Sequence, residues 1–345
     1  MNPLILCDES ILFAQEAFSQ FGELKLIPTL DIKNNLLEDA NLLIIRSVTK
    51  IDETLLKNSN IKIICTATTG TDNIDLEYLA KNNIKLFTSE GANSIAVAEY
   101  IQSCLIFILN KYYLKHDNLK LGIIGMGRIG NIVSKVAINL GFNIVVYDPP
   151  KQLASNNFKS SSLTEIFDCD IITLHVPLTR RQEYETYHLV DNDFLSSMKK
   201  NATLINTSRG GVVDSMALIK ALNNKTITSA ILDVWEEEPF FNLNLFNLCD
   251  IITPHIAGYS LDAKLKATEM LSISISKELK KTNIFTIKNI LPATNNYLLY
   301  DVLKDNNSFM SLIKLSNKNI ELKNEPYIFN LFRKNLNLRR DNLNV

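Results

Sequence analysis

Short apolar runs recur along the chain and alternate with segments of helical spacing. The runs are rich in β-branched residues and apolar at nearly every position, as strands buried on both faces of a parallel sheet are. The clearest are residues 42–47, 61–68, 120–125, 143–148, 170–176, 202–208, 227–234 and 250–256. Between runs, residues 94–111 and 128–140 repeat apolar side chains with the 3.6-residue period of a helix. This alternation predicts an α/β fold with parallel sheets.

The alternation divides into two blocks and a tail. Residues 1–92 alternate strands and helices without a phosphate-binding loop, whereas residues 93–257 open with a long helix and contain a glycine cluster. Residues 258–284 form one further helix, which could return to cover the first block and make that domain discontinuous. Glycine is absent after Gly258, and we expect a small third domain or arm from residue 285 onward.

Composition and charge narrow the class of protein. The 345 residues are 46% hydrophobic and 21% charged with a net charge of −1, which fits a soluble globular protein and lacks the basic field of a nucleic-acid-binding surface. The N-terminal apolar run, residues 4–7, is too short for a secretory signal, and no stretch approaches a membrane span. The five cysteines are scattered and match neither a zinc site nor a disulfide framework. We therefore expect a cytoplasmic protein with no nucleic-acid partner, no membrane partner and no metal.

The strongest local motif is a GxGxxG sequence formed by Gly125, Gly127 and Gly130 directly after an expected strand. Such glycines allow a tight turn and a close approach of the backbone to a pyrophosphate, which the following helix N-terminus attracts. The next strand ends at Asp148, where a carboxylate accepts hydrogen bonds from the ribose of NAD and repels the 2′-phosphate of NADP. The motif predicts a dinucleotide site for NAD, although Lys151 close by keeps NADP as the alternative.

Three residues with complementary chemistry follow later strands: Arg209, Glu238 and His255. Ligands of open α/β sheets bind beyond the carboxyl ends of the strands. Oxidation of a secondary alcohol on a carboxylic acid needs a base for the hydroxyl proton, and a neutral imidazole suits that role. It also needs a carboxylate that orients the imidazole and a cation that holds the substrate carboxylate, for which the planar fork of arginine is suited. The trio supplies one of each.

Each member of the trio also has an ordinary structural interpretation. A strand-end arginine is often part of a surface ion pair, an acid in an EEE run is usually solvated, and a histidine in an apolar stretch is often buried in a core. Three other histidines could supply the base: His116, His175 and His188. His175 ends its own strand and fits a cofactor cleft better than a catalytic role.

A third group of polar residues follows the strand at 42–47. The segment RSVTK places Arg46, Ser47 and Lys50 close together, and such a group can bind a carboxylate or a phosphate. A basic surface turn is the alternative.

The chain resembles the D-isomer-specific 2-hydroxyacid dehydrogenases over about residues 1–285. The motifs that carry the resemblance are, in order, GMGRIG (125–130), Asp148, HVPL (175–178), INTSRGGVVD (205–214), DVWEEEP (233–239) and PHIAG (254–258). The resemblance implies that Arg209 binds the substrate, Glu238 orients the histidine and His255 transfers the proton. It also implies two Rossmann-like domains: a discontinuous catalytic domain of residues 1–92 and 258–284, and an NAD-binding domain of residues 93–257 inserted in it.

The resemblance extends the set of expected NAD contacts. Arg128 and Ile129 would add loop amides to those of the three glycines. The other positions that match the family's cofactor contacts are Val176, Thr207, Ser208, Asp233 and Gly258. Asp233 ends a strand near the expected nicotinamide and could orient that ring.

A narrower resemblance is to the subfamily that oxidises 4-phospho-D-erythronate in the biosynthesis of pyridoxal 5′-phosphate (vitamin B6). It rests on RSVTK (46–50), TATTGTDNID (66–75), VVYDPP (145–150) and HIAGYS (255–260). It implies a small phosphorylated 2-hydroxy acid as substrate and contacts from Ser47, Thr68 and Tyr259. It also implies a C-terminal dimerisation domain at residues 285–345, abbreviated here, and a homodimer in which Arg339 or Arg340 could reach the partner's substrate.

Two other functions stay open at this stage. The first is another D-2-hydroxyacid dehydrogenase, with 3-phosphoglycerate as its substrate, against which Tyr259 and the C-terminal extension argue. The second is an NAD-sensing module without catalysis, against which the complete trio argues. The final electron acceptor, free NAD or a 2-oxo acid cosubstrate, is also open.

Overall fold

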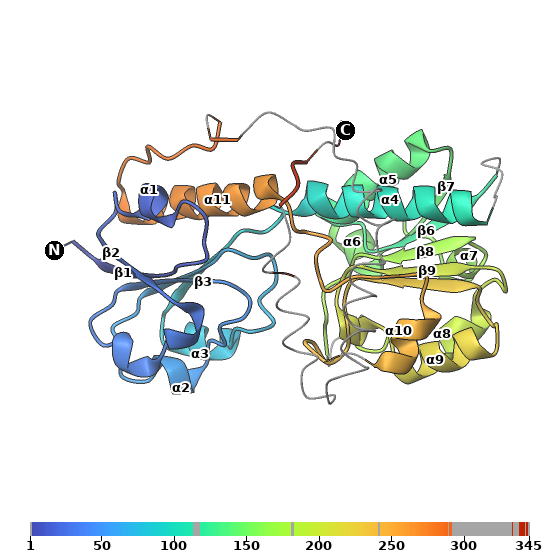
Figure 1. Cartoon of the computed structure of the whole chain (residues 1–345), viewed down its shortest axis with the longest axis horizontal. Helices are drawn as coiled ribbons and strands as arrows, with labels where there is room; N and C mark the ends of the chain where they lie inside the picture. The colour runs from blue at the N-terminus through green and yellow to red at the C-terminus, as the bar shows by residue number, and fades with distance from the viewer. Residues whose placement is uncertain are drawn as a thin grey trace, which may run out of the picture. The chain divides into compact units, whose positions relative to one another are not determined.

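The computed structural model describes residues 2–112, 118–180, 183–240, 242–288, 290–291, 333, 338–341 and 343. The contacts divide the chain into two compact units, the first within residues 1–93 and 259–295 and the second within residues 94–258 and 296–345 (Figure 1). Most of the predicted dimerisation domain, residues 285–345, lies outside the described residues, as does His116.

The first unit is built on a five-stranded parallel sheet in the order β2-β1-β3-β4-β5. Its strands are β1 (Leu4–Asp8), β2 (Glu23–Ile27), β3 (Leu42–Ile45), β4 (Ile63–Thr66) and β5 (Lys85–Thr88). Its helices are α1 (Ala14–Phe18), α2 (Glu53–Leu56), α3 (Leu76–Lys81) and α11 (Leu261–Leu279), with short 3₁₀ helices at Thr29–Asp31 and Asn34–Leu36. Helices α1 and α11 cover one face of this sheet, and α2 and α3 cover the other (Figure 1).

Burial on both faces explains why the inner strands β1, β3 and β4 of this unit are apolar at nearly every position. Leu271 and Ile275 of α11 pack with Ile44 of β3 in the cluster under α1. On the opposite face, Leu56 and Leu79 pack against other side chains of the same strands. Residues of a strand alternate between faces, so an inner strand of a sheet covered on both sides is buried at nearly every position.

The second unit contains a six-stranded parallel sheet in the order β11-β10-β9-β8-β6-β7. Its strands are β6 (Lys120–Ile124), β7 (Asn143–Tyr147), β8 (Ile171–Leu174), β9 (Thr203–Asn206), β10 (Ser229–Leu232) and β11 (Ile251–Ile252). Its helices are α4 (Ser94–Lys111), α5 (Arg128–Asn139), α6 (Pro149–Ala154), α7 (Leu163–Phe167), α8 (Asn192–Ser197), α9 (Ser215–Asn223) and α10 (Leu243–Leu248), with a 3₁₀ turn at Gly210–Val212. Helices α4 and α5 pack on one face and α7 to α10 on the other (Figure 1).

Both units are doubly wound α/β layers, so the predicted fold class is confirmed. In each sheet the strand order reverses once, between β1 and β3 in the first unit and between β6 and β8 in the second. Ligands of open α/β sheets bind at such switch points, beyond the carboxyl ends of the strands. Among the helices of the described residues, none has the length and apolar character needed to cross a membrane.

Candidate active site

The predicted catalytic trio emerges along one edge of the second sheet. Strands β9, β10 and β11 are adjacent and parallel. Arg209 follows β9, Glu238 lies in the segment after β10, and His255 follows β11. Their strands therefore deliver all three residues to the carboxyl edge of the sheet.

His255 and Glu238 form a direct pair. The distance from His255 Nδ1 to Glu238 Oε2 is 2.7 Å, and the other carboxylate oxygen accepts the Trp235 N–H at 2.9 Å. A carboxylate opposite Nδ1 favours the tautomer that carries its proton there, which leaves Nε2 unprotonated and able to accept a proton. Burial acts to raise the pKa of Glu238, but the hydrogen bond and charge of His255, the Trp235 N–H and the charge of Arg333 together hold this pKa below its usual value.

The turn that carries His255, residues 255–258, is fixed by Asp233. His255 has a positive φ of 56°, a left-handed conformation that costs energy in a residue other than glycine. Asp233 holds the turn because its Oδ1 accepts the Ile256 N–H at 2.7 Å and its Oδ2 accepts the Ala257 N–H at 2.9 Å. The Thr253 hydroxyl also donates to Oδ1, at 2.6 Å. We call residues 255–258 the His255 turn.

Asp233 thus has a structural partner for each carboxylate oxygen. Its side chain is 1% exposed, and burial raises its pKa despite the hydrogen bonds and the nearby His255. These contacts give it a positioning role in the His255 turn that sequence reasoning did not foresee. The role implied by the family resemblance, orientation of the nicotinamide, stays a prediction.

Arg209 lies at the start of a turn whose backbone packs closely against that of Trp235. A Cβ on Gly210 would lie 1.9 Å from the Trp235 carbonyl carbon and oxygen, so only glycine fits there. Asn206 Nδ2 donates to the Arg209 carbonyl at 2.9 Å, and the half-buried Arg209 side chain donates from Nη1 to the Ser208 carbonyl at 2.8 Å. The guanidinium is therefore presented from a fixed backbone.

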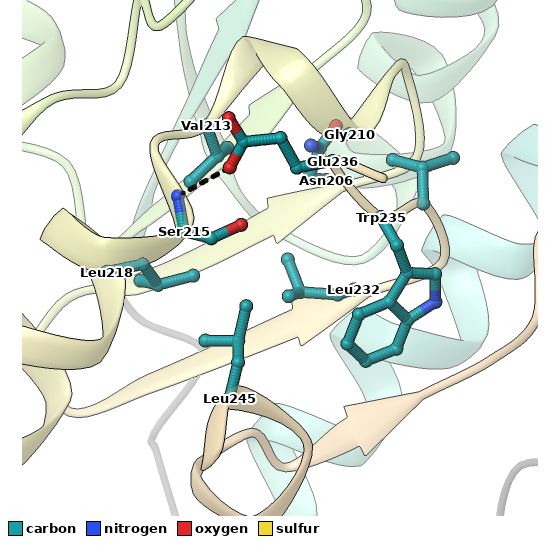
Figure 2. Close-up of a pocket in the computed structure, with 10 residues that line it drawn as sticks. Asn206, Gly210, Val213, Ser215, Leu218, Leu232, Trp235, Glu236 and Leu245 are labelled. Atoms are coloured by element: carbon teal, nitrogen blue, oxygen red, sulfur yellow. Dashed lines mark hydrogen bonds between the residues drawn. The ribbon is translucent and has the colours of Figure 1, made fainter. Parts of the chain in front are cut away.

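A second histidine–carboxylate pair supports the Arg209 turn. His188 Nε2 lies 2.5 Å from Glu236 Oε1, and the His188 N–H donates to the Gly211 carbonyl at 2.8 Å. Glu236 also accepts the Ser215 N–H at 3.1 Å, beside a mainly apolar pocket lined by Leu218, Leu232 and Leu245 among others (Figure 2). Burial opposes ionisation of Glu236, but its hydrogen bonds to His188 and Ser215 lower its pKa. The sequence offered no signal for this pairing.

The glycine loop after β6 forms an open cradle. Gly125 has φ +94°, and a Cβ there would lie 2.5 Å from the His175 carbonyl oxygen. A Cβ on Gly130 would lie 2.2 Å from the Gly125 carbonyl oxygen, whereas a Cβ on Gly127 would meet nothing within 4 Å. Helix α5 begins directly afterwards at Arg128, so its first N–H groups face this open space.

Two buried polar atoms on neighbouring strands lack a hydrogen-bond partner among the described residues. They are Thr207 Oγ1, after β9, and His175 Nδ1, after β8. Burial lowers the pKa of His175 to about 3, so its imidazole is neutral. Unpaired buried polar groups are rare, and together with the open cradle they fit a polar ligand such as a dinucleotide.

Asp148 lies at the end of β7, as predicted, but is already engaged with the glycine loop. Its Oδ2 accepts the Met126 N–H at 2.7 Å and its Oδ1 accepts the Lys151 N–H at 3.0 Å. Lys151 Nζ donates to the Met126 carbonyl at 2.6 Å, so its ammonium group is tied to the same loop. Each carboxylate oxygen can accept a further hydrogen bond.

The other predicted NAD contacts surround the same cradle and edge. Arg128 is exposed, Ile129 and Val176 are half-buried, Ser208 is buried after β9, and Gly258 is half-buried in the His255 turn.

The expected substrate ligands lie in the first unit, where Arg46 has a buried partner. Arg46 Nε lies 3.1 Å from Asp8 Oδ2, and its Nη2 donates to the Thr29 hydroxyl at 2.9 Å. Asp8 is fully buried at the end of β1, next to β3, so this pair marks the switch point of the first sheet. Nothing in the sequence indicated that Asp8 would hold Arg46.

The remaining expected substrate ligands are less constrained. Lys50 forms an exposed ion pair with Asp52 at 2.9 Å, which raises the pKa of Lys50 and lowers that of Asp52. Ser47 is exposed, and the Thr68 hydroxyl is 2.7 Å from that of Thr66. The Tyr259 ring lies 4.6 Å from Lys264 Nζ. Across the described parts of the chain, no group of acidic, histidine and cysteine side chains could hold a metal ion.

Comparison with known proteins gives the family. Residues 109–257 match the family described as "D-isomer specific 2-hydroxyacid dehydrogenase, NAD binding domain". An erythronate-4-phosphate dehydrogenase of Bacteroides thetaiotaomicron is 39% identical over 98% of this chain and 97% of its own length. That of Wigglesworthia glossinidia brevipalpis is 42% identical over 81% of this chain and 74% of its own length.

Solved structures agree. A D-lactate dehydrogenase from Aquifex aeolicus, complexed with NAD and lactic acid, is 27% identical with a TM-score of 0.63 over 80% of this chain and 95% of its own. An NAD-dependent formate dehydrogenase from Staphylococcus aureus, 24% identical with a TM-score of 0.65 over 85% of this chain and 99% of its own, shares the fold. The chain therefore belongs to the D-isomer specific 2-hydroxyacid dehydrogenase family and, within it, to the erythronate-4-phosphate dehydrogenases.

Proposed function

We propose that the protein oxidises 4-phospho-D-erythronate to (R)-3-hydroxy-2-oxo-4-phosphooxybutanoate with NAD, a step in the biosynthesis of pyridoxal 5′-phosphate. The observation that carries the proposal is the His255–Glu238 pair at 2.7 Å, next to the strand that presents Arg209. The near full-length similarity to an erythronate-4-phosphate dehydrogenase supports the choice of substrate.

The three side chains divide the work. Arg209 holds the substrate carboxylate through a two-pronged hydrogen bond and so orients C2. His255 Nε2 takes the proton of the C2 hydroxyl, and the imidazolium that forms is stabilised by the Glu238 carboxylate at Nδ1. Bound NAD supplies the acceptor of the hydride that leaves C2.

The same chain supplies an NAD site in the second unit. Gly125, Gly127 and Gly130, with the amides of Arg128 and Ile129, would receive the pyrophosphate at the start of α5. Asp148 would accept hydrogen bonds from the adenosine ribose, which favours NAD over NADP. The other proposed contacts are Val176, Thr207, Ser208, Asp233 and Gly258. Thr207 Oγ1, which lacks a partner among the described residues, is the best supported of these.

We assign the substrate's remaining contacts to the first unit. Ser47, Thr68 and Tyr259 would bind the phosphorylated acid, and Arg46 would add a positive charge fixed in place by Asp8. Lys50, more exposed and paired with Asp52, is the weakest member of this set.

The proposal extends to the protein's organisation. Residues 1–92 and 258–284 would form the catalytic domain, residues 93–257 the NAD-binding domain and residues 285–345 a dimerisation domain. The protein would act in the cytoplasm as a homodimer.

The test is the absorbance of NADH when purified protein meets 4-phospho-D-erythronate and NAD, with and without excess 2-oxoglutarate. We expect NADH formation, or reduction of the keto acid that depends on the phosphorylated substrate. We also expect His255→Ala to abolish either signal. Turnover of 3-phospho-D-glycerate alone would leave the family assignment intact and refute the substrate. Binding of NADH without turnover of either acid would refute catalysis.

A further inference from the structure

Glu99 is a buried carboxylate in helix α4, whose only other charged residue is Lys111 at its last position. Its neighbours Val97, Tyr100 and Ile101 are buried in the core of the second unit. The Glu99 side chain is 8% exposed. A carboxylate in such surroundings is costly unless a cation and hydrogen bonds compensate it.

The compensating cation comes from the other end of the chain. Arg339 Nε lies 3.5 Å from Glu99 Oε2, and the Arg339 side chain is also 8% exposed. Its Nη2 donates to two backbone carbonyls, that of Ala96 at 2.8 Å and that of Ala257 at 3.0 Å. Burial acts to lower the pKa of Arg339, while the negative charge of Glu99 opposes that shift.

The contact with Ala257 connects Arg339 to the His255 turn. The N–H of Ala257 donates to Asp233 at 2.9 Å, and its carbonyl accepts from Arg339 at 3.0 Å. Both polar groups of this residue, two positions after His255, are therefore held by buried charged side chains. On the same helix as Glu99, the Tyr100 hydroxyl is 2.6 Å from that of Thr253, which in turn donates to Asp233.

We propose that Arg339 is a positioning residue that fastens the His255 turn to helix α4 within its own subunit. It neutralises Glu99, bonds the backbone of α4 and bonds the backbone of the His255 turn, and it is not a ligand of the substrate. The planar guanidinium reaches these three partners at once, whereas the single ammonium group of lysine cannot reproduce the fork. The C-terminal segment would thus set the position of the catalytic base. The kinetic part of this proposal rests on the proposed function.

The variants are Arg339→Lys, Arg339→Gln and the double variant Glu99→Gln/Arg339→Gln. The double variant removes both charges, so it leaves no unpaired buried carboxylate and avoids the main reason for misfolding. Lys199→Gln is the control. It breaks an ion pair with Asp170 at the amino end of β8, at the edge opposite the His255 turn.

Steady-state kinetics separate positioning from substrate binding. We expect kcat of the double variant to fall about 10- to 100-fold, the equivalent of losing charge-assisted hydrogen bonds to the turn. The KM for the phosphorylated acid should stay within about threefold. Arg339→Lys should lie between the double variant and wild type, and Lys199→Gln should match wild type. A KM raised tenfold with kcat unchanged would make Arg339 a substrate ligand, and an unchanged kcat with only a lower melting temperature would make it a structural residue. Either result overturns the proposal.

Fluorescence tests the same contact without any substrate. Trp235 is the only tryptophan, and its indole N–H donates to the Thr253 carbonyl at 3.0 Å, two residues before His255. We expect a red-shifted emission and easier acrylamide quenching in Arg339→Gln and in the double variant, and wild-type spectra in Lys199→Gln. Unchanged spectra in all variants would refute the positioning role. Changed spectra in a protein that does not oxidise 4-phospho-D-erythronate would refute the proposed function and leave the positioning role standing.

Discussion

Replacing Glu238 by glutamine tests the proposed mechanism most directly. The change keeps the shape of the side chain and removes its charge. It also removes one of the two acceptor oxygens, which serve His255 Nδ1 at 2.7 Å and the Trp235 N–H at 2.9 Å. Glutamine has one oxygen, so its amide nitrogen must face one of these donors. If it faces His255, the imidazole adopts the tautomer with a proton on Nε2 and can no longer act as the base.

The expected loss of kcat follows from the distance between the two charges. Two unit charges about 4 Å apart interact by about 4 kcal/mol at an effective dielectric constant of about 20. The side chains of His255 and Glu238 are 36% and 25% exposed, so solvent screens their interaction and this energy must be reduced. We take roughly 2–3 kcal/mol for the stabilisation of the imidazolium, which corresponds to a fall in kcat of about 30- to 150-fold.

The assay is the rate of NADH formation at saturating 4-phospho-D-erythronate and NAD. The matched control is Glu237→Gln, because Glu237 is the exposed neighbour in the same EEE run and should keep wild-type kcat. A Glu238→Gln enzyme within threefold of wild type would refute the role of Glu238. A large loss of kcat in Glu237→Gln would instead make Glu237 the acid that orients His255.

Three further outcomes are expected. Asp233→Asn puts an amide nitrogen opposite a backbone N–H of the His255 turn, so the free energy of unfolding should fall by about 2–4 kcal/mol in denaturant titrations. A decrease of less than about 1 kcal/mol would contradict the role of Asp233 in holding the turn. Gly127→Ala should fold normally but bind NADH at least tenfold more weakly in fluorescence titrations, whereas Gly130→Ala should also lower the melting temperature because its Cβ would meet a carbonyl oxygen at 2.2 Å. Because the pKa of Glu238 is lowered in the folded protein, its pair with His255 stabilises the fold above the ordinary carboxyl pKa and loses that contribution as pH falls through the lowered value. The melting-temperature difference between wild type and Glu238→Gln should therefore be present at about pH 7 and shrink below about pH 4; a difference that is constant with pH would contradict it.

Eight of the eleven strands in the described part of the chain could be predicted from the sequence. Each of the eight predicted runs contains one strand of the structure, because a strand covered on both faces must be apolar at every position. Strands β1, β2 and β5 were not among the predicted runs. β2 and β5 are edge strands of the first sheet, and β2 carries Glu23 and Lys25 on exposed positions, so pairing with β1 rather than composition makes it a strand.

The placement of the site residues was predictable to a similar extent. The carboxyl ends of parallel strands share one edge, so Arg209, Glu238 and His255 could be expected near one another once the strands were recognised. Their chemical roles stay predictions. Glu99 shares helix α4 with one other charged residue, Lys111, and nothing in the sequence indicated that the partner of Glu99 would be Arg339.

By itself the sequence determined the α/β class, the dinucleotide-type glycine loop and the family, because these depend on local pattern and short-range spacing. Only the tertiary structure decided which charged groups meet: Asp8 with Arg46, Glu236 with His188, and Asp233 with the His255 turn. The physical reason is that a buried charge is tolerable only beside its partner, and the partner can lie anywhere along the chain. The fold, not the spacing of residues, selects which one it is.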